Sequence, residues 1–216
     1  MKTNSNIEKL YTDRASFYER LFMGFLGWGR ELEIFFRGAN YIHGNFKILD
    51  AGCGTGMITR VLYRLANEKD HAGINFHAFD LTQKMLEIFQ EWIAGQAGDH
   101  IELQRADVLE LESLPPHWKE YNLIVSSAML EHLPKDKIKD ALSNLKQLLG
   151  SEGTLLVIIT KRNFLTQWFI GKWWKTNLYA EQEIRALFHA VGFNKIEFKK
   201  FTPRWSNFIL VIEAKK

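Results

Sequence analysis

From Lys47 to the C-terminus, short apolar runs alternate with segments in which apolar residues recur at helical spacing. Runs of four to eight residues rich in β-branched and aromatic side chains predict strands, and apolar residues three and four apart predict amphipathic helices. The predicted strands are 47–51, 75–80, 101–105, 121–127, 153–160, 196–201 and 207–214. The predicted helices are 57–67, a helix capped by Thr82, 134–149 and 180–191.

Strand–helix alternation predicts a parallel sheet with right-handed crossover connections. The run 153–160, GTLLVIIT, is apolar throughout, which is typical of a strand covered on both faces. Only the short connection around Thr202-Pro203-Arg204 separates the last two strands, so we expect them to be antiparallel. Ligands of such sheets bind beyond the carboxyl ends of the strands. Polar residues that directly follow strands are therefore the candidates for chemistry.

A glycine-rich turn follows the first strand in the segment 48–56, ILDAGCGTG. Glycines at alternate positions let a ligand approach the backbone, and the helix that follows offers N–H groups to an anion. The turn alone is equally consistent with a tight strand-to-helix connection. Asp80 ends the second strand, where a carboxylate can receive ribose hydroxyls, and Asp107 follows the third strand, where it can accept from an adenine amine. Acids after successive strands favour a nucleotide-type ligand.

Composition narrows the class of protein. The 216 residues suffice for one domain, and 46% hydrophobic with 25% charged residues excludes a disordered chain. The net charge of +3 is too small to indicate a dedicated nucleic-acid binder. Cys53 is the single cysteine, which excludes a disulfide framework and fits a cytoplasmic protein. Inside the glycine turn it is interpreted as a small buried residue rather than a nucleophile.

Four segments together resemble the successive motifs of class I S-adenosylmethionine-dependent methyltransferases. They are 50–56 (DAGCGTG), 79–86 (FDLTQKML), 106–108 (ADV) and 121–133 (YNLIVSSAMLEHL). The resemblance extends from about Tyr11 to the C-terminus and is closest to the small-molecule enzymes called methyltransferase type 11.

The resemblance implies an α/β fold: a Rossmann-like seven-stranded, mostly parallel sheet with helices on both faces and the last strand antiparallel. It implies one class I methyltransferase domain, 1–216. Its parts are an N-terminal helical cap (1–45), a cofactor-binding core (46–160), an aromatic lid or insertion (161–179), and a C-terminal helix and hairpin (180–216).

The implied cofactor is S-adenosyl-L-methionine, with S-adenosyl-L-homocysteine as product. By the resemblance, the loop glycines cradle its methionine part, Asp50 holds the loop near the methionine amino group, and Asp80 binds the ribose. Asp107 takes the adenine amine. The implied cofactor-binding residues are Asp50, Gly52, Gly54, Gly56, Asp80, Leu81, Met85, Asp107, Val108, Ser126 and Ala128, with Tyr11 and Tyr18 from an N-terminal helix.

Methyl transfer from a sulfonium is an in-line displacement, so the protein mainly aligns the reactants, and a base is needed only if the acceptor loses a proton. The candidate catalytic residues are His132 and its neighbour Glu131; a histidine here is equally interpreted as positioning the loop. The remaining histidines show no metal-ligand spacing, and no metal is expected. We expect these histidines at surfaces or strand ends: His43, His71, His77, His100, His117 and His189.

The segment 161–179 contains six aromatic and four basic residues and no acid, in a chain that is 13% aromatic. One interpretation is an apolar cover with Phe164, Trp168 and Trp173 as substrate-binding residues, which implies a hydrophobic or aromatic small-molecule acceptor. A second is a peripheral membrane surface, since Trp with Lys and Arg settles at headgroups. The third is a helix packed into the core. A further aromatic group on the N-terminal helices has the spacing of a packing face.

Several alternatives to a methyltransferase remain open at this point. A non-catalytic cofactor-binding module with an aromatic partner or membrane surface has the same motifs. A nicotinamide-dependent oxidoreductase is less favoured, because Gly-x-Gly-x-Gly replaces Gly-x-Gly-x-x-Gly. A nucleic-acid acceptor is disfavoured, because Ser126-Ser127-Ala128-Met129 stands where base-amino methyltransferases carry Asn/Asp-Pro-Pro-aromatic. We expect no transmembrane segment and no targeting sequence, and the sequence indicates no oligomeric state.

Overall fold

A computed structural model describes residues 27–96, 101–163 and 177–216 of the chain. The sequence predictions for Tyr11, Tyr18, Phe164, Trp168 and Trp173 therefore lie outside the described residues, as does most of the predicted N-terminal cap.

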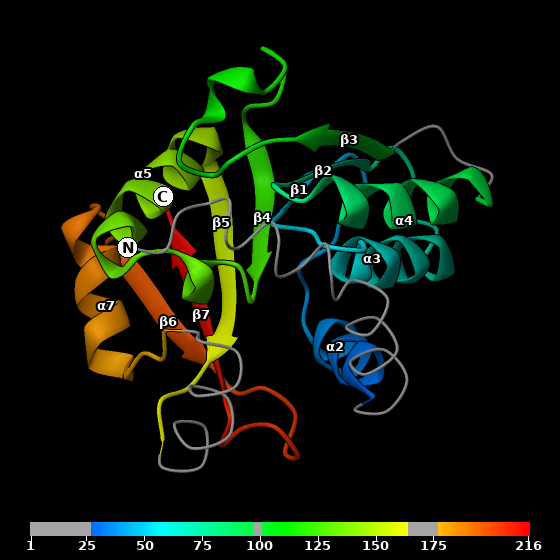
Figure 1. Ribbon diagram of the computed structural model, residues 1–216. Helices are drawn as coiled ribbons and strands as arrows, with labels where there is room; N and C mark the ends of the chain where they lie inside the picture. Colours follow the sequence, from blue (N-terminus) through cyan, green and yellow to red (C-terminus); the bar gives the residue numbers. More distant parts are fainter. Residues whose placement is uncertain (1–26, 97–100, 164–176) are drawn as a thin grey trace.

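The centre of the fold is a seven-stranded sheet in the order β3-β2-β1-β4-β5-β7-β6 (Figure 1). Strands β1 to β5 pair in parallel, and β7 is antiparallel to both of its neighbours, β5 and β6. This confirms the predicted mostly parallel sheet with an antiparallel last strand. The strands are β1 (Lys47–Ala51), β2 (Asn75–Asp80), β3 (Ile101–Arg105), β4 (Tyr121–Ser127), β5 (Leu149–Thr160), β6 (Lys195–Lys199) and β7 (Ile209–Lys215).

Helices cover both faces of the sheet, as predicted (Figure 1). Alternate residues of a strand point to opposite faces. On β1, Leu49 therefore packs into a core with α5 and α7, while Ile48 packs into a second core with α2 and α3. The side chain of Ala78 packs against α4. The helices are α2 (Trp28–Gly38), α3 (Met57–Glu68), α4 (Gln83–Ala94), α5 (Ile138–Leu148) and α7 (Glu181–Ala190).

Two predicted boundaries are wrong in the region between β4 and β5. The backbone of Pro134 is extended (ψ 141°), so a 3₁₀ turn, Lys135–Lys137, precedes α5 instead of a helix that begins at the proline. Strand β5 begins at Leu149 rather than at Gly153, because Leu149 pairs with Tyr121 across a register shift before the regular pairing resumes. A bulge of this kind gives no periodic signal in the sequence.

The prediction that the histidines lie at surfaces or strand ends is wrong for His77. Its side chain is buried within β2 and stacks on Trp118, with ring centroids 4.6 Å apart. His77 Nδ1 lies 2.7 Å from the hydroxyl oxygen of Tyr121. Burial lowers the pKa of His77 to about 4, so the imidazole is neutral at neutral pH.

The aromatic residues of α2 form a packing face, as their spacing predicted. Phe36 is buried, and Trp28 and Phe35 contact Phe201, which follows β6. The N-terminal part of the described chain is thereby attached to the last hairpin. None of the helices among the described residues combines the length and apolarity needed to cross a membrane.

Candidate active site

A cleft opens where the carboxyl ends of β1, β2, β3 and β4 meet, at the position where parallel α/β sheets bind ligands. It contains about 760 Å³ of empty space, including the part open to solvent. Its walls come from the last residues of β2 and β4, the turns after β1 to β4, and the first turn of α4. The lining residues are Gly52, Gly54, Phe79, Asp80, Leu81, Thr82, Met85, Ala106, Asp107, Val108, Ser127, Ala128, Met129, His132 and Leu133.

The three glycines of the turn have different surroundings, although each has a positive φ. A Cβ on Gly54 (φ 54°) would meet nothing within 4 Å, because this residue faces the open cleft. A Cβ on Gly56 (φ 84°) would lie 2.3 Å from the ring of Phe89. Gly56 therefore lets helix α4 approach the turn and does not itself line the cleft. Gly52 lies against Met129 and does line the cleft.

The carboxylate of Asp80 connects the turns that follow β1 and β2. Asp80 Oδ2 accepts a hydrogen bond from the Gly54 amide at 2.8 Å, and Oδ1 accepts one from the Thr82 amide at 2.8 Å. Burial raises the pKa of Asp80, and these N–H donors oppose the shift by stabilising the charged form. Thr82 occupies the N-cap position of α4 as predicted, but its hydroxyl makes no capping bond. Its donors are directed to Asp80 instead.

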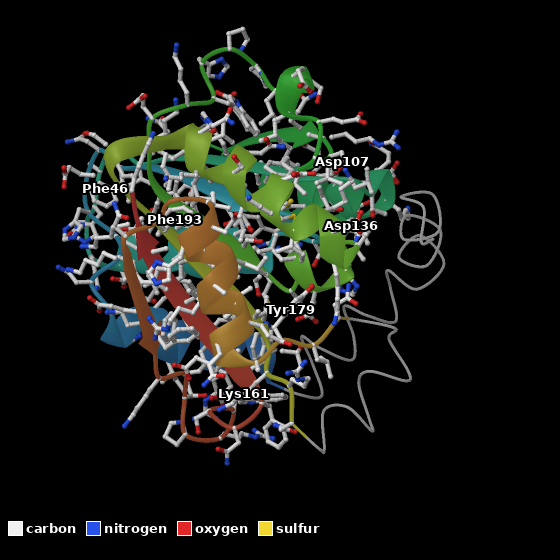
Figure 2. All side chains as sticks on the ribbon, turned by 90° about the vertical axis from the view of Figure 1, so that its left-hand side faces the viewer. Phe46, Asp107, Asp136, Lys161, Tyr179 and Phe193 are labelled. Atoms are coloured by element: carbon white, nitrogen blue, oxygen red, sulfur yellow. The ribbon has the colours of Figure 1, made fainter. Side chains whose placement is uncertain are left out.

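Asp107 lies in the turn after β3, at the edge of the sheet (Figure 2). Its Oδ1 accepts a hydrogen bond from the Leu109 amide at 2.9 Å, which orients the carboxylate at the cleft wall. The apolar side chains of Leu81, Met85 and Val108 line the same part of the cleft. This combination offers an apolar slot with an acceptor at its side, which suits a flat ring that carries an amine.

Asp50 lies behind the cleft rather than in its wall. Its side chain is buried, and Oδ2 accepts hydrogen bonds from the Thr59 hydroxyl at 2.8 Å and the Thr59 amide at 3.1 Å. The carboxylate thereby ties the start of α3 to β1. Oδ1 is buried and has no hydrogen-bond partner among the described residues. Burial raises the pKa of Asp50 to about 7.

Ser126 is also buried behind the cleft, and within the described chain its hydroxyl oxygen has no partner. Ala128 lines the cleft with a left-handed backbone (φ 58°), and its amide donates to the Ile158 carbonyl at 2.8 Å. The turn after β4 is thus anchored to β5.

His132 and Glu131, adjacent in sequence, have different surroundings. His132 lines the cleft. Glu131 is buried away from it, and its carboxylate accepts hydrogen bonds from the Thr160 amide at 2.7 Å and the Thr160 hydroxyl at 3.1 Å. We therefore correct the sequence interpretation of Glu131 as a candidate catalytic residue: it joins the turn after β4 to the end of β5. Burial raises the pKa of Glu131 to about 7.

The chain that follows the aromatic segment returns to this same junction. The Asn177 amide donates to the Glu131 carbonyl at 2.7 Å, and its side-chain amide donates to the Leu133 carbonyl at 2.6 Å. Tyr179 pairs with Lys161 in an isolated bridge, and Figure 2 shows both beside the end of β5. The C-terminal end of the segment 161–179 is therefore attached to Leu133 in the cleft wall, and its first residue pairs with Tyr179.

The sequence analysis missed six residues that line the cleft: Phe79, Thr82, Ala106, Ser127, Met129 and Leu133. All six are within one or two positions of a residue that was singled out, so the signal was their place directly at the strand ends. Met129 is the most informative of them, because its side chain occupies the space that the missing Cβ of Gly52 leaves.

Comparisons with known proteins agree with this geometry. Residues 48–153 match a family model described as a methyltransferase domain. Two curated relatives are named malonyl-[acyl-carrier protein] O-methyltransferase. The one from Halalkalibacterium halodurans is 29% identical over 109 residues, and the one from Paenibacillus sp. is 31% identical over 110 residues. These matches span about half of this chain, 50% and 51%, and 37% of each relative.

Solved structures share the fold over the whole chain. A SAM-dependent methyltransferase from Aquifex aeolicus superimposes with a TM-score of 0.68 at 16% identity, covering 100% of this chain and 99% of that one. A phosphoethanolamine N-methyltransferase from Haemonchus contortus has a TM-score of 0.72 at 16% identity, covering 100% of this chain and 58% of that one. Residues 48–153 thus match a methyltransferase domain, and the fold of the chain is that of solved S-adenosylmethionine-dependent methyltransferases.

The glycine geometry predicts different stability costs for two matched substitutions. Gly54→Ala places a side chain at positive φ in open space, which costs about 1–2 kcal/mol. Gly56→Ala adds the overlap with Phe89, worth about 1–3 kcal/mol more. We expect urea denaturation to show a lower midpoint for Gly56→Ala than for Gly54→Ala. Equal midpoints would contradict this account of the turn.

The burial of Glu131 predicts how stability depends on pH. Its pKa is about 7 in the folded protein and near 4.5 when unfolded, so the folded state binds more protons between these values. This group's contribution to stability is therefore highest below pH 4.5, falls as the pH rises towards 7, and is constant above it. The change in this contribution between low and high pH is about 3 kcal/mol. Thermal melts of Glu131→Gln should lose this part of the pH dependence, whereas the exposed control Glu181→Gln should retain it.

Proposed function

We propose that the protein binds S-adenosyl-L-methionine in this cleft and transfers its methyl group to a small hydrophobic or aromatic acceptor. The observation that carries the proposal is the convergence of Gly54, Asp80 and Asp107 on one cleft from the ends of three successive strands. A glycine turn alone is common, but a backbone approach site flanked by two fixed carboxylates suits a nucleoside with a charged tail.

The described residues fit each part of such a ligand. Asp80 would accept from the ribose hydroxyls, since its carboxylate lines the cleft and a carboxylate offers about four acceptor positions on its two oxygens. Asp107 would accept from the adenine amine, and Leu81, Met85 and Val108 would enclose the ring. Gly52 and Gly54 would contact the methionine part. The unpartnered Oδ1 of Asp50, behind the turn, supports an amino group or an ordered water at that end.

The bound sulfonium supplies an activated methyl group, so the chain's task is orientation and exclusion of water. Met129 and Leu133 give the acceptor side of the cleft an apolar wall. The titratable side chains among the lining residues are Asp80, Asp107 and His132. Because the two acids flank the proposed nucleoside site, His132 is the group placed to take a proton from an acceptor that must lose one.

Two observations bear on the acceptor, and each supports a different class of molecule. The aromatic segment ends at Asn177, which donates to the carbonyl of the cleft residue Leu133, and this supports a hydrophobic or aromatic small molecule. Both curated relatives are named for O-methylation of a malonyl group on an acyl-carrier protein, which makes an acyl carboxylate the second candidate. A cytoplasmic location, an acceptor other than nucleic acid and a peripheral membrane contact through the aromatic segment remain predictions from the sequence.

Cofactor binding is tested by calorimetry with S-adenosylhomocysteine. We expect saturable binding by the wild type. Asp80→Ala should lose it, because the substitution removes both the ribose acceptor and the bonds that shape the turn. Gly54→Ala should weaken binding by filling the site of closest approach. The control Asp136→Ala alters an exposed acid outside the lining residues and should bind as the wild type does. Absence of wild-type binding at millimolar ligand would overturn the proposal.

Turnover separates an enzyme from a non-catalytic cofactor-binding module. Release of S-adenosylhomocysteine would be measured with aromatic alcohols and amines, hydrophobic carboxylic acids and malonyl-acyl-carrier protein as acceptors. We expect turnover with at least one class, and a loss for His132→Ala that becomes smaller as pH rises if the histidine takes the proton. Tight cofactor binding without turnover on any class would favour the binding module.

A further inference from the structure

Three potential metal ligands meet on the sheet, outside the cleft that binds the proposed cofactor. His77 comes from β2, Glu102 from β3 and His117 from the connection before β4. One ligand atom from each lies within 4.8 Å of the others. His77 and Glu102 are register partners on adjacent strands, so the sheet itself fixes their spacing. None of the three lines the cleft.

We propose that His77, Glu102 and His117 form a binding site for a divalent transition metal ion, with zinc as the best match. Two imidazoles and one carboxylate are ligands that zinc accepts, and a water completes such a three-ligand site. The inference concerns a site separate from the proposed methyl transfer and does not depend on it.

The distances between the ligand atoms fit a tetrahedral ion. With zinc bonds of about 2.0–2.2 Å, neighbouring ligand atoms lie about 3.4 Å apart. His117 Nε2 lies 2.9 Å from Glu102 Oε2, and His77 Nε2 lies 3.7 Å from Glu102 Oε1. The two distances run to different oxygens of Glu102, one below and one above the required value, so binding of an ion requires a small shift of these side chains. Glu102 and His117 have side chains 51% and 58% exposed, so both can adjust and an ion has access from solvent.

Contacts with Tyr121 and Trp118 already orient His77, the buried member of the three metal ligands. Tyr121 contacts His77 Nδ1 through its hydroxyl at 2.7 Å, which leaves Nε2 directed toward Glu102. The Trp118 ring stacks on His77, and its Nε1 donates to Glu102 Oε2 at 3.0 Å. A histidine ligand in metal sites characteristically contacts a second polar group through its other nitrogen. These contacts therefore preorganise His77 and Glu102 for an ion.

The positive charge of Lys47 lies near the proposed site and lowers the expected affinity for a metal ion. The ammonium of Lys47 donates to the His117 and Lys119 carbonyls and lies 5.2 Å from the centroid of the Tyr121 ring. Its charge repels a divalent ion, and the carboxylate of Glu102 offsets only part of the total positive charge. We therefore expect a dissociation constant in the micromolar range. Binding would connect β2, β3 and the segment before β4, and so stabilise that end of the sheet.

The test is a titration of the full chain, free of any affinity tag, with Zn²⁺ by calorimetry and with Co²⁺ by visible absorption. We expect one ion per chain, a tetrahedral Co²⁺ spectrum and a rise in melting temperature with Zn²⁺. His117→Gln and Glu102→Gln change exposed side chains and should keep the fold, yet weaken binding by at least about tenfold. Lys47→Met should tighten binding severalfold, because it removes the opposing charge.

The matched control is His189→Gln, which removes an exposed histidine on α7, far from these ligands in the sequence. It should bind as the wild type does. The proposal is overturned if wild-type protein shows no saturable binding at millimolar Co²⁺, or if His117→Gln and His189→Gln bind alike. Far-ultraviolet circular dichroism of each variant checks that the fold is retained.

Discussion

The hydrogen bonds of Asp80 hold the cleft in its shape. One carboxylate, at the end of β2, accepts from the backbone of the turn after β1 and from the backbone that begins α4. Two turns that are far apart in the chain are thus held at one point. Burial raises the pKa of this carboxyl group, and the N–H donors oppose that shift because they stabilise its charged form. The same carboxylate therefore both shapes the turns at this edge of the sheet and offers acceptor oxygens to the cleft.

A second carboxylate organises the opposite wall. Glu131 connects the turn after β4 to Thr160 at the end of β5, and its carbonyl receives the amide of Asn177. The turn after β4, the end of β5 and the chain at Asn177 are thereby joined by hydrogen bonds. Two carboxylates thus hold the turns around the cleft: Asp80 is half-buried and lines the open space, whereas Glu131 is buried behind it. The sheet topology explains where these acids lie, and their hydrogen-bond partners determine what each one does.

Much of the fold follows from local patterns. The bounds of β1, β2, β3 and β4 agree with the predicted runs, because each is a short segment of apolar or alternating apolar and polar residues that ends at a turn. The predicted bounds of β5 and of the two strands of the last hairpin, β6 and β7, were less accurate. Their ends depend on pairing across the sheet, such as Leu149 with Tyr121, which leaves no periodic trace in either segment alone.

The sequence by itself determined the sheet class, the glycine turn and the acids that follow the strands, since these depend on spacing along one segment. Only the tertiary structure decided which neighbour faces the cleft. Within the 3₁₀ turn Leu130–His132, successive side chains point in different directions, so His132 lines the cleft and Glu131 is buried beside Thr160. The same holds for His77, whose partners Glu102 and His117 come from other elements. Contacts between segments far apart in sequence carry no local signal, because only folding creates them.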